Sequence, residues 1–326
     1  MRAARLVAPG RVEVARVAVP EPGPRQALIR MRRASICGSD VHVVFHGFEP
    51  DMLPAAPGYP GHEGVGEVVE TRSNLFAAGD RVLTVPVPSQ AGCFADFQVV
   101  DETSLVPLPP GGDLARLLMA QQLGTTIYAL RRFWPIPGAE PGVATLIGAG
   151  SAGLFFLQQL LSAGWETIVA ADREPARLEI ARELGATTCV RAPEESVVEA
   201  TMDHSGGEGA DLVIEAAGYD ACRAQAVEAV RYRGRVGLFG FPERKGDSPF
   251  PINLAFRKGA TIEFSVGAQL EPRLRSFSDA LDAISSGRVE VGYCLAPTFP
   301  IEGVAEALTL ARERGRGAVK LSIALD

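Results

Sequence analysis

The spacing of hydrophobic residues divides the chain into two parts with different rhythms. From residue 2 to about residue 106, short runs that alternate apolar and polar residues are separated by turn residues. Such alternation is typical of strands that bury one face. The first part is therefore predicted to be a mainly antiparallel β domain, with strands at 12–19, 27–31, 64–70, 81–85 and 94–100.

Beyond Thr125 the rhythm changes to short apolar runs that alternate with helical patterns. This alternation indicates βαβ units, and therefore an α/β fold with a doubly wound parallel sheet. Helices are expected around 275–286 and 304–314, with a last strand at 320–324. The six strands of the parallel sheet are predicted at 143–147, 167–171, 188–190, 211–215, 235–239 and 261–266.

Composition and charge narrow the class of protein. The chain has 326 residues, 47% of them hydrophobic and 22% charged, which is ordinary for a soluble globular protein with room for two domains. The formal net charge is -7, from 39 acidic and 32 basic residues. That balance gives no electrostatic footprint for nucleic acid or an anionic membrane, so a small-molecule partner is favoured.

The cysteines and the N-terminus indicate the compartment. Five cysteines, an odd number, are widely scattered, which argues against a disulfide framework and for a reducing environment. The N-terminus lacks the long apolar run of a signal peptide, and no apolar run of 18 residues occurs. We expect a cytoplasmic protein.

A glycine-rich loop carries the first candidate site. Gly148-x-Gly150-x-x-Gly153 directly follows the predicted strand Val143–Ile147 and leads into an apolar helical run. Gly148 permits a tight turn, Gly150 lets a pyrophosphate approach the backbone, and Gly153 lets helix and strand pack closely. With Ser151 and Ala152 between them, these residues are predicted to bind a dinucleotide; the alternative is an ordinary turn.

An acidic residue indicates which dinucleotide is bound. Asp172 lies 19 residues after Gly153, at the end of the next predicted strand. A carboxylate there accepts hydrogen bonds from the adenosine ribose and repels a 2′-phosphate, which favours NAD over NADP. Arg173 and Arg177 are close enough to tolerate some phosphate. A solvated charge at a strand end is the competing interpretation.

Two short motifs near the N-terminus carry metal-binding side chains. They are Cys37-Gly-Ser-Asp-Val-His42 and Gly61-His-Glu63. Thiolate and neutral imidazole are ligands that Zn²⁺ prefers, and a catalytic zinc site needs only three protein ligands. Together with the dinucleotide loop, they suggest hydride transfer at an alcohol or carbonyl. Taken singly, Cys37 could be a small buried hydrophobic residue, His42 a surface histidine and Ser39 a helix N-cap.

These motifs, in this order, resemble the zinc-dependent medium-chain dehydrogenase/reductase superfamily, close to its sorbitol, threonine and glucose dehydrogenase branches. The resemblance runs from Met1 to Asp326 and includes Gly79-Asp-Arg-Val82, residues 211–218 and Gly234-Arg-Val236. It implies a GroES-like catalytic domain at 1–122, an NAD-binding Rossmann domain at 123–267, and a return to the catalytic domain at 268–326.

The resemblance also implies a ligand set. Cys37 and His62 would be zinc ligands, with Asp40 orienting His62. The family's third ligand is a cysteine or a glutamate, and the matching stretch here is Ala120-Gln-Gln-Leu123. Gln121 is the expected third ligand, with Gln122 as an alternative. Glu63 would lie behind the metal and serve as an extra ligand when no substrate is present.

Other roles follow from the same resemblance. Ser39 would accept the proton of the substrate hydroxyl and pass it through the cofactor ribose to His42, which releases it to water. Thr125 would support the nicotinamide. Lys320 would lie near the pyrophosphate, or else be a solvated strand residue.

The family's structural zinc lobe would fall between Val85 and Phe94, an interval that contains only Cys93. A closed tetrahedral site needs four ligands. We therefore expect no structural zinc and one catalytic zinc ion per chain. The shortened lobe is similar to that of small reductases of the superfamily, some of which contain no metal.

The sequence thus predicts an NAD-dependent, zinc-assisted dehydrogenase of a secondary alcohol, such as a polyol, sugar or cyclitol. A zinc-free quinone or enoyl reductase and a non-catalytic NAD sensor are the alternatives. By resemblance, a homodimer is expected through the strand at 261–266, with a tetramer as the alternative.

Overall fold

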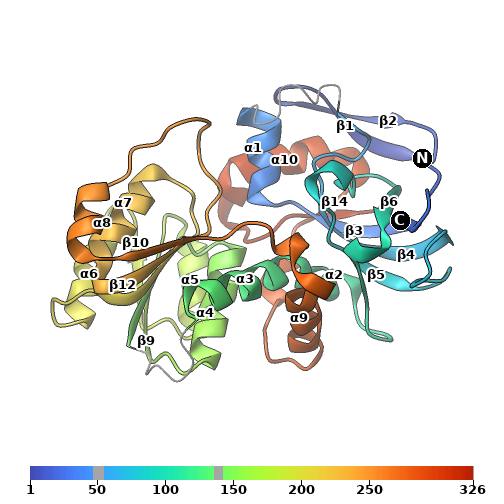
Figure 1. Ribbon diagram of the computed structural model, residues 1–326. Coiled ribbons are helices and arrows are strands. Elements are labelled where there is room, and N and C mark those ends of the chain that lie inside the picture. The colour runs from blue at the N-terminus through green and yellow to red at the C-terminus, as the bar shows by residue number, and fades with distance from the viewer. Residues whose placement is uncertain (47–54, 136–141, 326) are drawn as a thin grey trace. The chain divides into compact units, whose positions relative to one another are not determined.

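The computed structural model describes residues 1–46, 55–135 and 142–325. The backbone packs into two compact units. Unit 1 contains Met1–Thr125 together with Gln269–Asp326, and unit 2 contains Thr126–Ala268. Both units are drawn in Figure 1.

Unit 1 is built on a seven-stranded sheet and a separate hairpin. In the sheet the order is β14-β15-β3-β4-β5-β7, and β6 pairs with β3. The pairings are antiparallel except that of β14 with β15. The strands are β3 (Gln26–Ser35), β4 (Glu63–Thr71), β5 (Arg81–Thr84), β6 (Phe97–Asp101), β7 (Leu105–Pro107), β14 (Thr298–Pro300) and β15 (Ser322–Ala324), with the hairpin β1 (Arg2–Ala8) and β2 (Arg11–Arg16).

Alternating apolar residues give this sheet its buried face. Ile29 and Met31 on β3 are completely buried, as is Ile323 on β15, and they share one core with Phe94. The described helices of unit 1 are α1 (Gly38–His46), α2 (Leu114–Leu118), α9 (Arg275–Ser285) and α10 (Val304–Arg312), and α3 (Ala120–Phe133) begins in this unit. The mainly antiparallel sheet of the prediction is confirmed.

Unit 2 is a six-stranded parallel sheet in the order β10-β9-β8-β11-β12-β13. Helices α4 and α5 cover one face, and α6, α7 and α8 cover the other (Figure 1). The strands are β8 (Val143–Ile147), β9 (Thr167–Asp172), β10 (Thr188–Arg191), β11 (Ala210–Glu215), β12 (Val230–Leu238) and β13 (Thr261–Phe264). The helices are α4 (Ser151–Ser162), α5 (Pro175–Leu184), α6 (Val197–His204), α7 (Asp220–Ala229) and α8 (Ile252–Lys258).

Burial on both faces explains the apolar runs that predicted these strands. Val169, Val213 and Val236 are all within 1% of complete burial. The predicted doubly wound sheet is confirmed, with one difference in β12, which begins at Val230 and not at residue 235. Its pairing with β11 shifts register between Val230 and Arg235, and this irregularity hides the first half of the strand from a periodicity argument.

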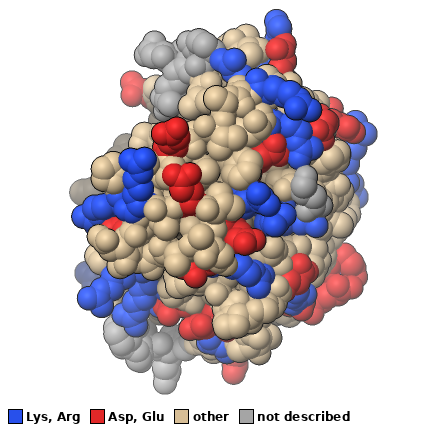
Figure 2. Space-filling model, turned by 90° about the vertical axis from the view of Figure 1, so that its right-hand side faces the viewer, with Lys and Arg blue, Asp and Glu red and all other residues tan. Residues whose placement is uncertain are grey.

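The surface and the helices agree with the charge pattern of the sequence. On the face shown in Figure 2, basic and acidic side chains are interspersed with uncharged ones, without a field of one sign. Among the described residues, no helix combines the length and apolar character needed to cross a membrane.

Candidate metal centre and nucleotide loop

Three side chains in unit 1 converge into a cluster that could hold a metal ion. One ligand atom each of Cys37, His62 and Glu63 lies within 4.8 Å of the other two. Cys37 and His62 are partly buried and Glu63 is buried. A thiolate, an imidazole and a carboxylate form a donor set that suits Zn²⁺. Glu63, expected behind the metal, thus lies in the cluster itself.

The turn between β3 and α1 positions Cys37. Strand β3 ends at Ser35 and α1 begins at Gly38, so Cys37 lies in the short connection. The backbone N–H of Cys37 donates a hydrogen bond to Asp40 Oδ2 at 2.9 Å, and the N–H of Asp40 returns one to Cys37 O at 3.1 Å. The Asp40 carboxylate, in the first turn of α1, therefore fixes the backbone that carries the thiol.

The same carboxylate orients His62. Asp40 Oδ1 lies 3.0 Å from His62 Nδ1, which is also 3.2 Å from Pro60 O. Burial alone would lower the pKa of His62, but the Asp40 carboxylate raises that pKa well above its usual value. Burial also raises the pKa of Asp40, against the effect of His62. Since Nδ1 faces Asp40, Nε2 is the ring nitrogen left for a metal.

Glu63 is held from the opposite side. In the pairing of β3 with β4, Glu63 lies directly across from Ser35, whose hydroxyl donates to Glu63 Oε2 at 2.5 Å. The Lys320 ammonium lies 2.6 Å from the same oxygen. Burial alone would raise the pKa of Glu63, but Lys320 lowers it, so the carboxylate is ionised.

The structure corrects the expectation for Lys320. Its side chain is only 3% exposed, so it is not a solvated strand residue. Its ammonium contacts Glu63 and donates to Gln122 Oε1 at 3.3 Å, so its partners lie in unit 1 and are not the expected phosphate. Burial would lower the pKa of Lys320, but Glu63 raises it. The contact with Lys320 also gives Gln122 a partner other than a metal.

A buried cysteine supports the turn that carries His62 and Glu63. The backbone N–H groups of Gly92 and Cys93 donate to Gly61 O at 2.7 and 3.0 Å, and Cys93 Sγ donates to Glu63 O at 3.3 Å. A Cβ added to Gly61 would lie 2.8 Å from Cys93 Sγ, so the backbones approach too closely for a side chain. Burial raises the pKa of Cys93 well above its usual value, which keeps this thiol protonated.

The remaining predicted residues of unit 1 lie on two helices. Ser39 and His42 are half-buried in α1, and the His42 ring contacts that of His46 edge to face at 4.9 Å. Gln121 is buried in the first turn of α3, and its carbonyl accepts a hydrogen bond from Thr125 Oγ1 at 3.0 Å. Their roles in proton transfer, metal binding and nicotinamide binding stay predictions.

In unit 2, the glycine loop lies between β8 and α4. Gly150 is the N-cap residue of α4, and no side chain caps the helix. The first N–H groups, from Ser151, Ala152 and Gly153, therefore have no side-chain acceptor at the helix start and suit a phosphate. A Cβ added to Gly153 would lie 1.9 Å from Gly148 O, so only glycine lets the helix pack against the loop.

Asp172 joins this loop to the end of β9. Its Oδ2 accepts the N–H of Ala149 at 2.7 Å, and its Oδ1 accepts the N–H of Glu174 at 2.9 Å. Arg177 Nη1 lies 4.0 Å from Asp172 Oδ2, whereas Arg173 is exposed. The acid, Arg177 and the glycine loop are thus brought together, as the nucleotide site of the prediction requires.

A residue that our sequence analysis did not single out shapes the neighbouring loop. Glu215, completely buried at the end of β11, accepts the N–H groups of Ala217 and Gly218 at 2.7 and 2.6 Å. A Cβ added to Gly148 would lie 3.0 Å from Ala217 N, so this loop contacts the glycine loop. Burial raises the pKa of Glu215. An acidic residue at the end of an apolar strand was the available signal.

The shared role of Asp40 gives a testable prediction. Asp40→Asn keeps the shape of the side chain but removes the negative charge beside His62. We expect zinc affinity to fall by about 10- to 100-fold, as for other residues that orient metal ligands. Competition with a chromogenic chelator measures this affinity. Asp80→Asn, an exposed acid in the same unit, is the control, and an unchanged affinity in Asp40→Asn would contradict the orienting role.

Known proteins share both units. Residues 23–110 match the family described as "Alcohol dehydrogenase GroES-like domain", and residues 152–286 match that described as "Zinc-binding dehydrogenase". An L-threonine 3-dehydrogenase of Burkholderia multivorans is 30% identical over 292 residues, covering 81% of this chain and 82% of that protein. An L-threonine 3-dehydrogenase of Bacillus velezensis is 28% identical, covering 94% and 93%.

A solved structure agrees with these sequence matches. The alcohol dehydrogenase TADH from Thermus sp. ATN1 is 28% identical and superposes with a TM-score of 0.84, covering 99% of both chains. The fold, the two family matches and the zinc-type donor cluster all lead to one assignment. The chain belongs to the zinc-dependent medium-chain dehydrogenase/reductase superfamily, whose members are dehydrogenases that act on alcohol groups.

Proposed function

We propose that this protein is an NAD-dependent, zinc-assisted dehydrogenase that oxidises a secondary alcohol to a ketone, or catalyses the reverse reaction. The observation that carries the proposal is the cluster of Cys37, His62 and Glu63. The similarity to L-threonine 3-dehydrogenases supports a secondary hydroxyl as the reacting group. A polyol, sugar or cyclitol is the substrate class that we propose.

The donor set fits a catalytic zinc ion. Cys37 and His62 would hold the ion, and Glu63 offers the third ligand atom within the cluster. Gln121 remains the other candidate for that position. When bound, zinc supplies a Lewis acid that lowers the pKa of an alcohol, and the nicotinamide accepts the hydride.

The protein itself must hold the substrate and remove a proton. We propose that Ser39 accepts the proton of the hydroxyl group and that His42 releases it to water, since a histidine titrates near neutral pH. Both residues lie on α1, directly after Cys37. Asp40, on the same helix, keeps His62 in the tautomer that presents Nε2.

The first experiment tests the metal. Cys37→Ala removes the only thiol of the cluster, and we expect loss of bound zinc and a fall in kcat/KM of about 100-fold or more. Metal analysis of protein purified without chelators, with NAD reduction over a panel of polyols and amino alcohols, gives both readouts. Cys189→Ala in unit 2 is the matched control.

Two outcomes would replace the proposal. A Cys37→Ala variant that is metal-free and fully active would indicate a zinc-free quinone or enoyl reductase. A wild-type protein that binds NAD but is inactive with every alcohol and ketone of the panel would indicate a non-catalytic NAD sensor.

We propose NAD as the preferred cofactor, because the Asp172 carboxylate lies beside the glycine loop. Asp172→Asn keeps an oxygen for the Ala149 N–H but removes the charge that repels a 2′-phosphate. We expect the ratio of kcat/KM for NADP to that for NAD to rise about tenfold or more. Steady-state kinetics with both cofactors measures the ratio, and Asp203→Asn, an exposed acid on α6, is the control. An unchanged ratio would remove Asp172 from cofactor selection.

We further propose that the protein forms a homodimer through β13. This strand is the edge of the parallel sheet, and Phe264 and Val266, on it and just beyond it, are 64% and 80% exposed. An edge strand with exposed apolar residues is suited to pairing with a second copy.

Val266→Glu should therefore weaken the dimer, since it places like charges on two paired edges. We expect a shift towards monomer in sedimentation equilibrium, with no change for Leu75→Glu, a similarly exposed apolar position in unit 1. A wild-type monomer would overturn the proposal, and a tetramer that Val266→Glu leaves intact would place the interface elsewhere.

A further inference from the structure

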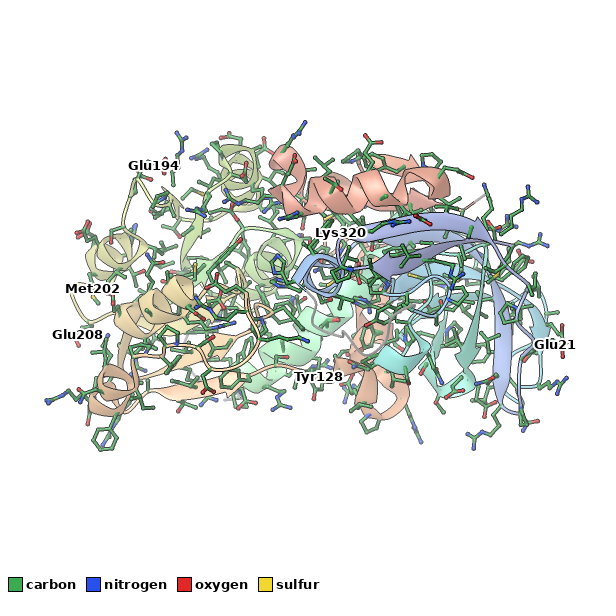
Figure 3. All side chains as sticks on the ribbon, turned by 90° about the horizontal axis from the view of Figure 1, so that it is seen from above. Glu21, Tyr128, Glu194, Met202, Glu208 and Lys320 are labelled. Atoms are coloured by element: carbon green, nitrogen blue, oxygen red, sulfur yellow. The ribbon has the colours of Figure 1, made fainter. Side chains whose placement is uncertain are left out.

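The buried ammonium of Lys320 has no part in the proton path or nucleotide site proposed above. Lys320 (labelled in Figure 3) is 4% exposed and lies next to the metal cluster through Glu63. Its position is fixed by the backbone, because the following residue, Leu321, accepts the N–H of Ile36 at 2.9 Å. A buried cation beside a cation-binding cluster weakens metal binding, so its presence calls for a reason.

The contacts of Glu63 show how the two cations would share one carboxylate. Oε2 accepts from both the Ser35 hydroxyl and the Lys320 ammonium. Oε1 accepts none of the described hydrogen bonds and is the oxygen left for the cluster. A metal and Lys320 would therefore lie on either side of the same carboxylate, and Ser35 and Lys320 prevent Glu63 from turning both oxygens to the metal.

Charge balance gives the consequence. Zinc with the Cys37 thiolate and the Glu63 carboxylate as its anionic ligands forms a neutral centre, which polarises an alcohol weakly. The ammonium of Lys320 restores one positive charge next to that centre. Asp40 contributes the same charge with or without Lys320, so it does not alter the comparison.

We propose that Lys320 is a positioning residue that limits Glu63 to one oxygen as a zinc ligand and keeps the centre electropositive, at the expense of zinc affinity. This inference rests on the proposed function, because it concerns the same metal site. It differs from a purely structural role in the sign of one effect. A structural lysine would hold the cluster together, and its loss would weaken zinc binding.

Lys320→Gln is the decisive variant, since it can still donate a hydrogen bond to Glu63 but carries no charge. We expect zinc to bind about tenfold more tightly or better, and to leave more slowly to a chelator, because one repulsive charge is gone. We expect kcat to fall by about tenfold over the same range of substrate. Lys320→Arg, which keeps the charge, should retain both properties within about threefold.

Additional variants keep the test independent of folding and activity. Glu63→Gln should shift zinc affinity in the opposite direction, towards weaker binding, and Lys258→Gln in unit 2 should change neither property. Cobalt substitution gives a readout without turnover, because the ligand-field bands of Co²⁺ should shift in Lys320→Gln when Glu63 is free to rotate. If Lys320→Gln does not fold without metal, refolding with zinc or cobalt supplies the material.

The outcomes separate the inference from the function it rests on. Wild-type protein that binds no zinc through Cys37 and His62 would overturn the proposed function. Wild-type protein that binds zinc, with equal or weaker zinc affinity in Lys320→Gln, would overturn the role of Lys320 alone. Tighter zinc with lower kcat is the result that supports it.

Discussion

Two carboxylates beside the metal cluster, those of Asp40 and Glu63, are withdrawn from water, and each is 1% exposed. A buried carboxylate is costly unless hydrogen bonds and an opposite charge compensate for its lost hydration. Asp40 receives the Cys37 N–H and faces His62, and Glu63 receives Ser35 and Lys320. These contacts fix the positions of the thiol, the imidazole and the third ligand atom before any cation arrives.

This requirement explains much of the arrangement of unit 1. Glu63 reaches Ser35 only because β3 and β4 pair in one particular register, in which a shift by one residue would turn both side chains to the other face. Lys320 reaches Glu63 only because the C-terminal segment returns to unit 1, where β15 pairs with β3. The discontinuous composition of the unit thus supplies the counter-charge of the metal site from a distant part of the sequence.

The sequence was sufficient for the fold class and for the donor chemistry. Continuous apolar runs such as Val143–Ile147 and the glycines after it predicted the parallel sheet, because strands buried on both faces leave that pattern. Cys37 and His62 stood out because few residue types bind zinc. Contacts between strands leave no such mark. Ser35 and Cys93 are ordinary residues in the sequence, and only the register of β3 with β4 and the close approach at Gly61 give them a role. Lys320 was assigned to a phosphate because its partner lies far away along the chain.

Asp40 holds the Cys37 backbone and the His62 ring through its two oxygens, and both contacts exist in a protein without a cation. The binding geometry therefore does not depend on occupancy. Loss of the ion would leave an idle but intact catalyst, and resupply would restore it without any step of chain reorganisation. Turnover would then follow the free zinc level of the surroundings as a reversible, dose-dependent response.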